Sequence, residues 1–228
     1  MMTEQRDGAR AAIFDLDGTL AETAPDLIGA ANALLEVHGL PPFDATAARC
    51  MAGLGGKALI RHGFASAGEP RDESEINALF PHYLELYEAR IDRESRLYEG
   101  VTETLDSLAA AGWRLGVCTN KPEGLARLLL ERLGVLGRFE ALVGADTLPV
   151  RKPDPRPLLH CIAEVGGAPA RSALIGDSRT DRDAARNARV ASVLVRFGYA
   201  QEPIDSLSPE AKIDHFSDLE AALERLAL

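Results

Sequence analysis

The sequence predicts a doubly wound α/β fold with a mainly parallel sheet and a helical domain inserted after the first strand. Three observations carry this prediction. Short apolar runs each stop at a polar or charged segment, helical patterns separate these runs along most of the chain, and one long stretch has helical patterns alone. Alternation of strands and helices is typical of α/β proteins, whose crossovers place helices on both faces of a parallel sheet.

The first expected strand is the apolar run at residues 11–14, which ends abruptly at Asp15-Leu16-Asp17-Gly18. Three later runs have the same design, at residues 113–117, 172–175 and 192–195. They end at Cys118-Thr119-Asn120, Gly176-Asp177-Ser178 and Arg196. None alternates with polar residues, so each is expected to be buried on both faces of a parallel sheet.

Helical periodicity fills the intervals between these runs. It is carried mainly by leucines, among them Leu105, Leu108, Leu125, Leu129, Leu158 and Leu159. The last helix is expected to begin with a capping box at Ser217-Asp218-Leu219-Glu220 and to carry Leu219, Leu223 and Leu226 on one face.

The stretch from about residue 21 to residue 97 does not alternate. It contains helical patterns at residues 27–37, 58–65 and 76–91 and no convincing strand. We therefore expect two domains: a discontinuous α/β core formed by residues 1–20 and 97–228, and an α-helical cap formed by residues 21–96.

Composition narrows the classes of function. The chain has 228 residues, 46% hydrophobic and 26% charged, which is the balance of a globular protein. Its formal net charge of −10 argues against nucleic acid as a partner, because phosphate backbones select basic surfaces. A small anionic substrate remains compatible, since a local cluster of cations overrides the overall sign.

Cysteine usage and apolar runs indicate a cytoplasmic protein with no membrane partner. Cys50, Cys118 and Cys161 lie far apart without a CxxC pair, so they are expected to be buried thiols of a reducing compartment. The segment MMTEQRDGAR lacks the apolar stretch of a secretory signal, and no run approaches the ~20 residues that span a bilayer. The oligomeric state stays open, a homo-oligomer included.

The chemistry is expected at Asp15 and Asp17. In extended chain, residues i and i+2 point the same way, so these two carboxylates should converge where the first strand ends. Like charges so placed are costly unless a cation lies between them or one takes a proton. One carboxylate can then attack phosphorus while the other protonates the leaving oxygen. Gly18 and Thr19 would supply a tight turn whose N–H groups face phosphate oxygens.

The string from Ile13 to Leu20, which contains Asp-Leu-Asp-Gly-Thr, resembles the first motif of the haloacid dehalogenase (HAD) superfamily, whose core is Rossmann-like. Thr119 matches the second motif, Lys152 in Arg151-Lys152-Pro153 the third, and Gly176-Asp177-Ser178-Arg179-Thr180-Asp181 the fourth. All four occur in order, and the resemblance covers essentially the whole chain.

The resemblance implies a role for each matched residue. Asp15 would be the nucleophile and a metal ligand, and Asp17 the general acid and base, with its backbone carbonyl on the metal. Asp177 would complete the ligands of a Mg²⁺ ion, and Asp181 would be an outer-shell or occasional direct ligand. Thr119 and the Asn120 N–H would hold a phosphate oxygen, as would Gly18, and Lys152 would offset the shared negative charge.

Strings in the expected cap resemble those of phosphoglycolate phosphatases within the superfamily. They are Ala24-Pro25-Asp26-Leu27, the glycine-rich Ala52-Gly53-Leu54-Gly55-Gly56, and Tyr98-Glu99-Gly100-Val101 at the return to the core. Nearby cations that could meet a substrate carboxylate are Arg49, Lys57 and Arg61. Departures from the family pattern occur at Glu22-Thr23, Glu99 and Arg189, where the family usually has Asp-Ser, Pro and Gly. The first departure leaves the exact substrate open.

The resulting expectation is a Mg²⁺-dependent phosphomonoester hydrolase that acts through an aspartyl phosphate, with 2-phosphoglycolate as the favoured substrate. Alternatives in the same superfamily are a phosphatase or phosphomutase acting on a sugar phosphate, a nucleotide or pyrophosphate. Asp17 argues against a dehalogenase, since a departing halide needs no acid. Phosphonoacetaldehyde hydrolysis would need a cap lysine, for which Lys57 is a candidate by location. The non-enzyme alternative is a catalytically silent binding protein, against which the intact Asp15, Asp17, Lys152 and Asp177 argue.

Overall fold

The computed structural model describes residues 8–228; residues 1–7, most of the segment in which no secretory signal is expected, lie outside the described part. The chain divides into two compact units. Met1–Ala21 and Leu97–Leu228 form one, the core unit, and Glu22–Arg96 form the other, the helical unit. Two short strands, β2 (Ala21–Glu22) and β3 (Arg96–Leu97), pair where the chain passes between the units.

Within the described residues, the core unit contains one six-stranded sheet with the order β5-β4-β1-β6-β7-β8, every pair of which is parallel. The strands are β1 (Ala9–Phe14), β4 (Arg114–Cys118), β5 (Ala141–Val143), β6 (Gly167–Gly176), β7 (Ala191–Val195) and β8 (Ala211–Ile213). The predicted parallel α/β core is thereby confirmed. The edge strands β5 and β8 were not expected, because three residues each are too few to show a pattern.

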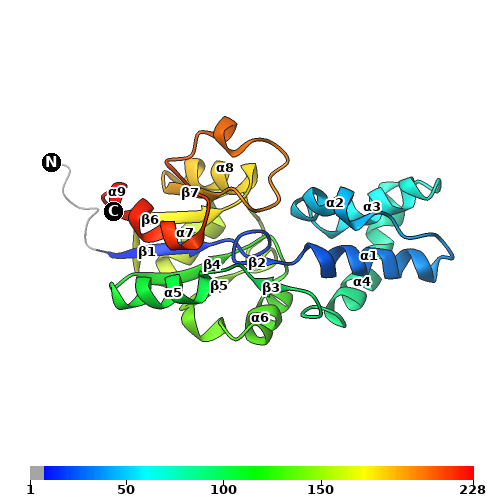
Figure 1. Cartoon of the computed structure of the whole chain (residues 1–228), viewed down its shortest axis with the longest axis horizontal. Coiled ribbons are helices and arrows are strands. Elements are labelled where there is room, and N and C mark those ends of the chain that lie inside the picture. Colours follow the sequence, from blue (N-terminus) through cyan, green and yellow to red (C-terminus); the bar gives the residue numbers. More distant parts are fainter. Residues whose placement is uncertain (1–7) are drawn as a thin grey trace. The chain divides into compact units, whose positions relative to one another are not determined.

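Helices flank this sheet (Figure 1). They are α5 (Val101–Ala110), α6 (Glu123–Arg132), α7 (Pro155–Glu164), α8 (Arg179–Ala188) and α9 (Leu219–Arg225), with short 3-10 turns η2 (Leu136–Arg138), η3 (Ile204–Leu207) and η4 (Phe216–Asp218). Ala11 and Ile13 of β1 pack in a cluster with α7 and α8, so Ala12 and Phe14 face the opposite side of the sheet. All four are fully buried, which confirms the expected burial of this strand on both faces.

The order of the strands fixes where a ligand binds. From β1 the chain builds outward through β4 to β5, then returns to the other side of β1 and continues through β6, β7 and β8. The reversal point therefore lies between β1 and β6, and ligands of doubly wound sheets bind beyond the carboxyl ends of the strands at that point. Asp15 and Asp177 directly follow these two strands.

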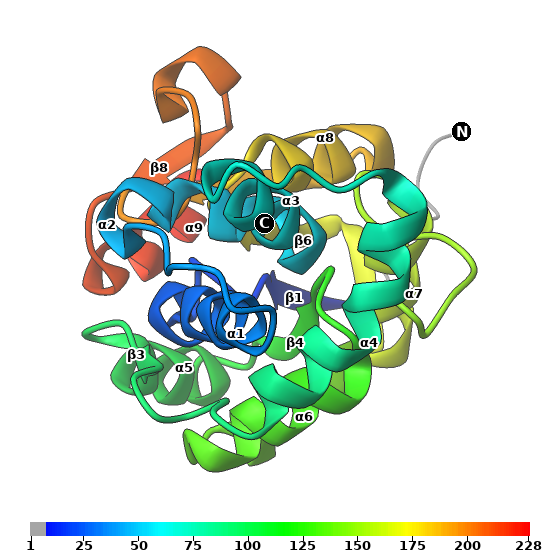
Figure 2. The ribbon, with the colours of Figure 1, turned by 90° about the vertical axis from the view of Figure 1, so that its right-hand side faces the viewer.

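The helical unit contains α1 (Ala24–Val37), α2 (Ala45–Ala48), η1 (Arg49–Leu54), α3 (Gly56–Ser66) and α4 (Glu73–Glu88). Helices α1, α3 and α4 pack against one another (Figure 2). The aspartate of the Ala-Pro-Asp-Leu string, Asp26, is buried and ties the start of α1 to the end of the unit. Its Oδ2 accepts hydrogen bonds from the Glu94 N–H (2.9 Å), the Ser95 N–H (2.8 Å) and the Ser95 hydroxyl (2.8 Å).

Two expectations about local structure are wrong. The last helix has no capping box at Ser217: α9 begins at Leu219 without a side-chain cap, because residues 216–218 form the turn η4, capped instead by His215. Cys118 and Cys161 are buried as expected, but Cys50 is exposed. Nowhere in the described residues is a helix long and apolar enough to cross a membrane.

Candidate active site

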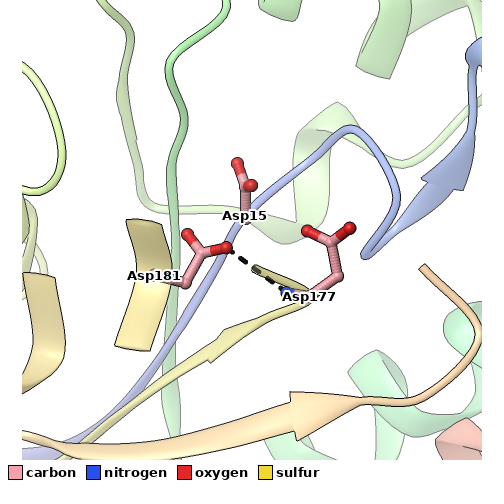
Figure 3. Close-up of side chains that lie close together, drawn as sticks. All are labelled: Asp15, Asp177 and Asp181. Atoms are coloured by element: carbon pink, nitrogen blue, oxygen red, sulfur yellow. Dashed lines mark hydrogen bonds between the residues drawn. The ribbon is translucent and has the colours of Figure 1, made fainter. Parts of the chain in front are cut away.

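Three carboxylates meet at the carboxyl edge of the sheet, beside the reversal point. Asp15 follows β1, Asp177 follows β6, and Asp181 lies in the first turn of α8 (Figure 3). One oxygen from each lies within 4.8 Å of the others, and Asp177 and Asp181 are buried. Oxygen donors of this kind suit a hard cation such as Mg²⁺.

Backbone and side-chain donors fix the Asp177 carboxylate. The Tyr199 N–H donates to its Oδ2 at 2.5 Å, and the Thr19 hydroxyl lies 3.5 Å from its Oδ1. Two glycines make this approach feasible. A Cβ on Gly18 would lie 2.5 Å from Asp177 Oδ2, and a Cβ on Gly198 would lie 2.2 Å from Asp177 Cβ. Neither position therefore has space for a larger residue.

The Asp181 carboxylate is held by the N-terminus of its own helix and by Lys152. Its Oδ2 accepts from the Ser178 hydroxyl (2.6 Å), the Ser178 N–H (3.2 Å) and the Asp177 N–H (3.3 Å), which completes a capping box. Its Oδ1 accepts from Lys152 Nζ at 2.6 Å. These contacts orient Asp181 and link α8 to the neighbouring loop.

Lys152 lies between two of the carboxylates. Its Nζ is 3.0 Å from Asp15 Oδ1 as well as 2.6 Å from Asp181, and its side chain is 1% exposed. Burial lowers the pKa of this ammonium, but the two carboxylates outweigh burial and raise the pKa above its ordinary value. The Asn120 side-chain amide donates to the Lys152 carbonyl at 3.0 Å, so residues after β4 also position this lysine.

The electrostatics of the three carboxylates favour binding of a further positive charge. Burial raises the pKa of Asp15 to about 6, although the nearby Lys152 opposes this shift. Burial, together with the neighbouring Asp181 and Asp15, also raises the pKa of Asp177 well above its usual range. Carboxylates that repel one another in a buried site fit a divalent cation, which would neutralise them.

Asp17 lies in a different electrostatic environment. Lys121 Nζ is 2.8 Å from its Oδ1 and 3.2 Å from its Oδ2. Each of the two carboxylates contacts its own lysine, and the group of three neighbouring carboxylates found among the described residues contains Asp15 but not Asp17.

The backbone of the turn after β1 corrects one expectation. The Gly18 N–H donates to the Ala21 carbonyl (2.9 Å) and the Thr19 N–H to the Leu16 carbonyl (3.3 Å), so these groups close the turn instead of facing a phosphate. The contribution of Gly18 is its missing side chain and its φ of 81°, which favours glycine. Thr119 is buried directly after β4, and its Oγ1 accepts from the Lys121 N–H at 3.2 Å.

Two contributors to the site were missed by sequence reasoning. Lys121 lies two residues after Thr119, and Tyr199 lies in the loop after β7. The rule that polar residues at strand ends carry the chemistry would have found Lys121, had it been extended past Asn120. Tyr199 acts through its backbone N–H, for which the sequence contains no signal.

Comparison with known proteins assigns the family. A family model described as haloacid dehalogenase-like hydrolase matches residues 12–195. A phosphoglycolate phosphatase of Caulobacter vibrioides is 46% identical over 209 residues, which are 92% of this chain and 88% of that protein. The chain belongs to the haloacid dehalogenase-like hydrolases. The predicted resemblance is thereby confirmed, and the protein is an enzyme of a hydrolase family.

Other relatives in this family carry two different names. A phosphoglycolate phosphatase of Agrobacterium fabrum is 43% identical and covers 93% of this chain and 91% of its own. An N-acetylmuramic acid 6-phosphate phosphatase of Pseudomonas aeruginosa is 36% identical and covers 95% of both chains. The solved structure of a protein described as a predicted phosphoglycolate phosphatase, from Haemophilus somnus, has a TM-score of 0.85 at 30% identity and covers 97% of this chain and 99% of its own.

Proposed function

We propose that this protein is a Mg²⁺-dependent 2-phosphoglycolate phosphatase that acts through an aspartyl phosphate on Asp15. The observation that carries the chemistry is the pairing of two aspartates with two different lysines, Asp15 with Lys152 and Asp17 with Lys121. It gives the two carboxylates separate environments and hence separate roles. The substrate rests on the names of the relatives at 40% identity and above.

Asp15 is the proposed nucleophile. It follows β1 beside the reversal point, and its side chain remains 14% exposed, so one carboxylate oxygen can meet a phosphorus atom. The new bond joins Asp15 to phosphorus as the bond between phosphorus and the ester oxygen breaks. Lys152 offsets the negative charge that accumulates on the carboxylate and on the phosphoryl oxygens.

Asp17 is the proposed general acid and base. It donates a proton to the departing alkoxide, which leaves as glycolate, and it then takes a proton from the water molecule that attacks the aspartyl phosphate. The second step releases inorganic phosphate and restores the Asp15 carboxylate. With a side chain that is 19% exposed, Asp17 has access to that water.

Asp15 and Asp177 are the proposed side-chain ligands of the cation, with the backbone carbonyl of Asp17 as a third ligand and Asp181 in the outer shell. The donor set fits Mg²⁺, since it consists of oxygen atoms whose repulsion a divalent ion would relieve. When bound, Mg²⁺ would neutralise charge between the carboxylates and a phosphoryl oxygen. Thr119 and the Asn120 N–H are the proposed donors to the phosphoryl group, because the Thr119 hydroxyl accepts from Lys121 and keeps its own proton to donate.

The proposed partner is a small phosphorylated metabolite in the cytoplasm. The net charge of −10 permits such an anion, because Lys121 and Lys152 place positive charge at the site. A second candidate substrate is N-acetylmuramic acid 6-phosphate, because a 36% identical relative carries that name. Both compounds contain a carboxylate. In 2-phosphoglycolate it is one methylene group from the ester oxygen, whereas in the sugar phosphate it lies far from it.

The test is release of inorganic phosphate from a panel of 2-phosphoglycolate, N-acetylmuramic acid 6-phosphate, a hexose phosphate, a nucleotide, pyrophosphate and an aryl phosphate. We expect the highest kcat/KM for 2-phosphoglycolate and no turnover in EDTA. A preference for another compound of the panel, with 2-phosphoglycolate at background, would contradict the proposed assignment of the substrate. Full activity in EDTA would contradict the mechanism. Absence of phosphate release from every compound of the panel would favour the alternative of a catalytically silent binding protein.

A further inference from the structure

The segment Phe197-Gly198-Tyr199, here called the β7 loop, follows β7 in the core unit and packs closely on Asp177. A Cβ on Gly198 would lie 2.2 Å from Asp177 Cβ and 2.5 Å from its Oδ2. Such distances leave no space for a side chain at position 198. The loop backbone therefore lies directly against the proposed cation ligand.

The same loop also packs on the turn that follows β1. A Cβ on Gly198 would lie 2.6 Å from the Gly18 carbonyl oxygen, and a Cβ on Gly18 would lie 2.7 Å from Tyr199 Cδ2. This turn contains Asp17, whose backbone carbonyl is a proposed ligand of the cation. The β7 loop thus contacts the residue after β6 and the turn after β1, which provide two of the proposed ligands.

The donors that hold the Asp177 carboxylate differ in kind from those that hold Asp15. The Tyr199 N–H donates to Asp177 Oδ2 at 2.5 Å, and the Thr19 hydroxyl makes a weaker contact with Oδ1 at 3.5 Å. Both donors are neutral, whereas Asp15 contacts the Lys152 ammonium. A neutral donor orients a carboxylate without cancelling its charge, so the charge remains for a cation. Groups that orient a metal ligand in this way raise the affinity for the metal.

The ring of Phe197 anchors the other end of the β7 loop. It is half-buried, with its centroid 4.6 Å from that of Tyr98 and 5.9 Å from that of Phe216. Phe216 is fully buried, and the Tyr98 N–H donates to the Leu20 carbonyl at 3.1 Å. Aromatic contacts of this kind stabilise a fixed arrangement. The loop is therefore held at one end by neighbouring rings and at the other by Asp177.

We propose that Phe197 and Gly198 are positioning residues for the cation. Phe197 holds the β7 loop in place, and Gly198 lets it approach closely enough for the Tyr199 N–H to orient Asp177. The inference rests on the proposed function, because it takes Asp177 as a ligand of Mg²⁺. Neither side chain makes or breaks a bond in the reaction.

Gly198→Ala tests the close approach with a single added carbon atom. The backbone at Gly198 is outside the left-handed region, so the substitution acts through the space that the Cβ occupies. Gly124→Ala, in the first turn of α6, is the matched control, because a Cβ there would meet no neighbouring group within 4 Å among the described residues. The measurement is the dissociation constant of Mg²⁺ alone, by isothermal titration calorimetry without substrate and at one pH.

Phe197→Ala tests the anchor of the loop in the same assay. Phe139→Ala is its matched control, since Phe139 is also half-buried in the core unit and its ring contacts that of Phe14, with 6.1 Å between centroids. Circular dichroism checks that each protein is folded. If Phe197→Ala does not fold, Phe197→Leu gives the same comparison, and the Phe197 variants carry the test if Gly198→Ala does not fold.

We expect Gly198→Ala to weaken Mg²⁺ binding by about 10- to 100-fold, the usual effect of losing a group that orients a metal ligand. Phe197→Ala should weaken it by about tenfold, the lower end of that range, because the glycine is retained. Both control variants should bind Mg²⁺ like the unmodified protein. The Mg²⁺ concentration for half-maximal turnover should rise with the dissociation constant, with a smaller change in kcat at saturating Mg²⁺.

The outcomes separate this inference from the proposed function. Equal Mg²⁺ affinity in folded Gly198→Ala and Gly124→Ala would overturn the inference, as would a fall in kcat at saturating Mg²⁺ with the affinity unchanged. Equal affinity in Phe197→Ala and Phe139→Ala would overturn the part assigned to Phe197. Absence of Mg²⁺ binding to the unmodified protein would contradict the proposed function and the inference with it. Weakened binding together with a substrate other than 2-phosphoglycolate would support the inference and contradict only the proposed substrate.

Discussion

At the residue scale, the two aspartates after β1 differ in what they contact, and this difference predicts their roles. Asp15 lies close to Asp177, Asp181 and Lys152, whereas Asp17 forms an ion pair with Lys121. A carboxylate beside a cation site is suited to attack phosphorus. A carboxylate outside that group is suited to exchange protons with the leaving group and with water.

Asp17→Asn keeps the shape of the side chain and the backbone carbonyl but cannot exchange a proton. We expect turnover of an alkyl phosphate to fall by roughly 10²–10⁴, the usual worth of positioned acid–base catalysis. Asp15→Asn should lose more, because it removes the nucleophile and a ligand of the cation. The measurement is steady-state kcat for both variants on 2-phosphoglycolate.

An aryl phosphate supplies the control for these two variants. Its leaving group departs without a proton, so it should partly restore the first step in Asp17→Asn and restore nothing in Asp15→Asn. Equal inactivity of both variants on both substrates, or near-full activity of Asp17→Asn, would refute the division of roles.

At the scale of elements, helix α8 begins with a residue of the candidate site and ends in a strained backbone conformation. Its first turn holds Asp181 through the capping box with Ser178. Its last turn passes into Arg189, whose φ of 57° is in the left-handed region. The family usually has glycine at this position, and a left-handed helix cap explains that preference.

Arg189→Gly is therefore expected to raise the free energy of unfolding by about 0.5–1 kcal/mol. Relief of a left-handed conformation gives about 1–2 kcal/mol, and the extra chain entropy of glycine in the unfolded state removes part of this gain. Arg189→Ala is the matched control, because it removes the same side chain but keeps the Cβ, and it should give no gain. Urea unfolding measures both, and an equal effect of the two substitutions would exclude backbone strain as the cause.

At the scale of the whole molecule, the carboxylates and lysines of the site all belong to the core unit, and their charge links stability to pH and to the cation. Burial raises the pKa of Asp15 to about 6, and burial with the neighbouring carboxylates raises that of Asp177 well above its usual range. A carboxyl whose pKa is higher in the folded state binds its proton more tightly there than in the unfolded chain. The metal-free protein therefore loses stability as pH rises through about 4 to 6.

A bound cation should reverse this trend, since it needs ionised carboxylates and competes with protons. We expect Mg²⁺ to raise the Tm little near pH 5 and clearly more near pH 8, measured against EDTA at each pH. Asp177→Asn should abolish most of the increase at the higher pH. A Tm increase that is independent of pH, or one that survives in Asp177→Asn, would place the cation elsewhere.

The sequence by itself determined the four inner strands of the sheet and the chain positions of the chemistry. Apolar runs without polar alternation can be buried only between two layers, so β1, β4, β6 and β7 were predictable. Asp15, Thr119 and Asp177 follow three of those runs, and the carboxyl ends of parallel strands share one edge of a sheet. Each run is a continuous apolar segment that is followed at once by polar residues, so its end could be located from the sequence.

The tertiary structure decided which side chains meet. The pairing of Asp17 with Lys121 joins residues 104 positions apart, and that of Lys152 with Asp181 joins residues 29 apart, so no local pattern encodes either one. Tyr199 contributes a backbone N–H, which any residue except proline has. The turn from Leu16 to Ala21 used the N–H groups of Gly18 and Thr19, because a buried turn must satisfy its own donors first.

The same distinction explains the expectations about local structure that were wrong. Ser217 has the residue types of a capping box, but residues 216–218 form a 3-10 turn, with Phe216 fully buried. The His215 side chain caps this turn by accepting from the Ser217 N–H at 3.2 Å, so the cap comes from a residue two positions earlier than expected. Sequence periodicity determines which segments must be buried, because burial is the largest stabilising term. Partners across the fold are chosen only when the packed chain brings distant segments together.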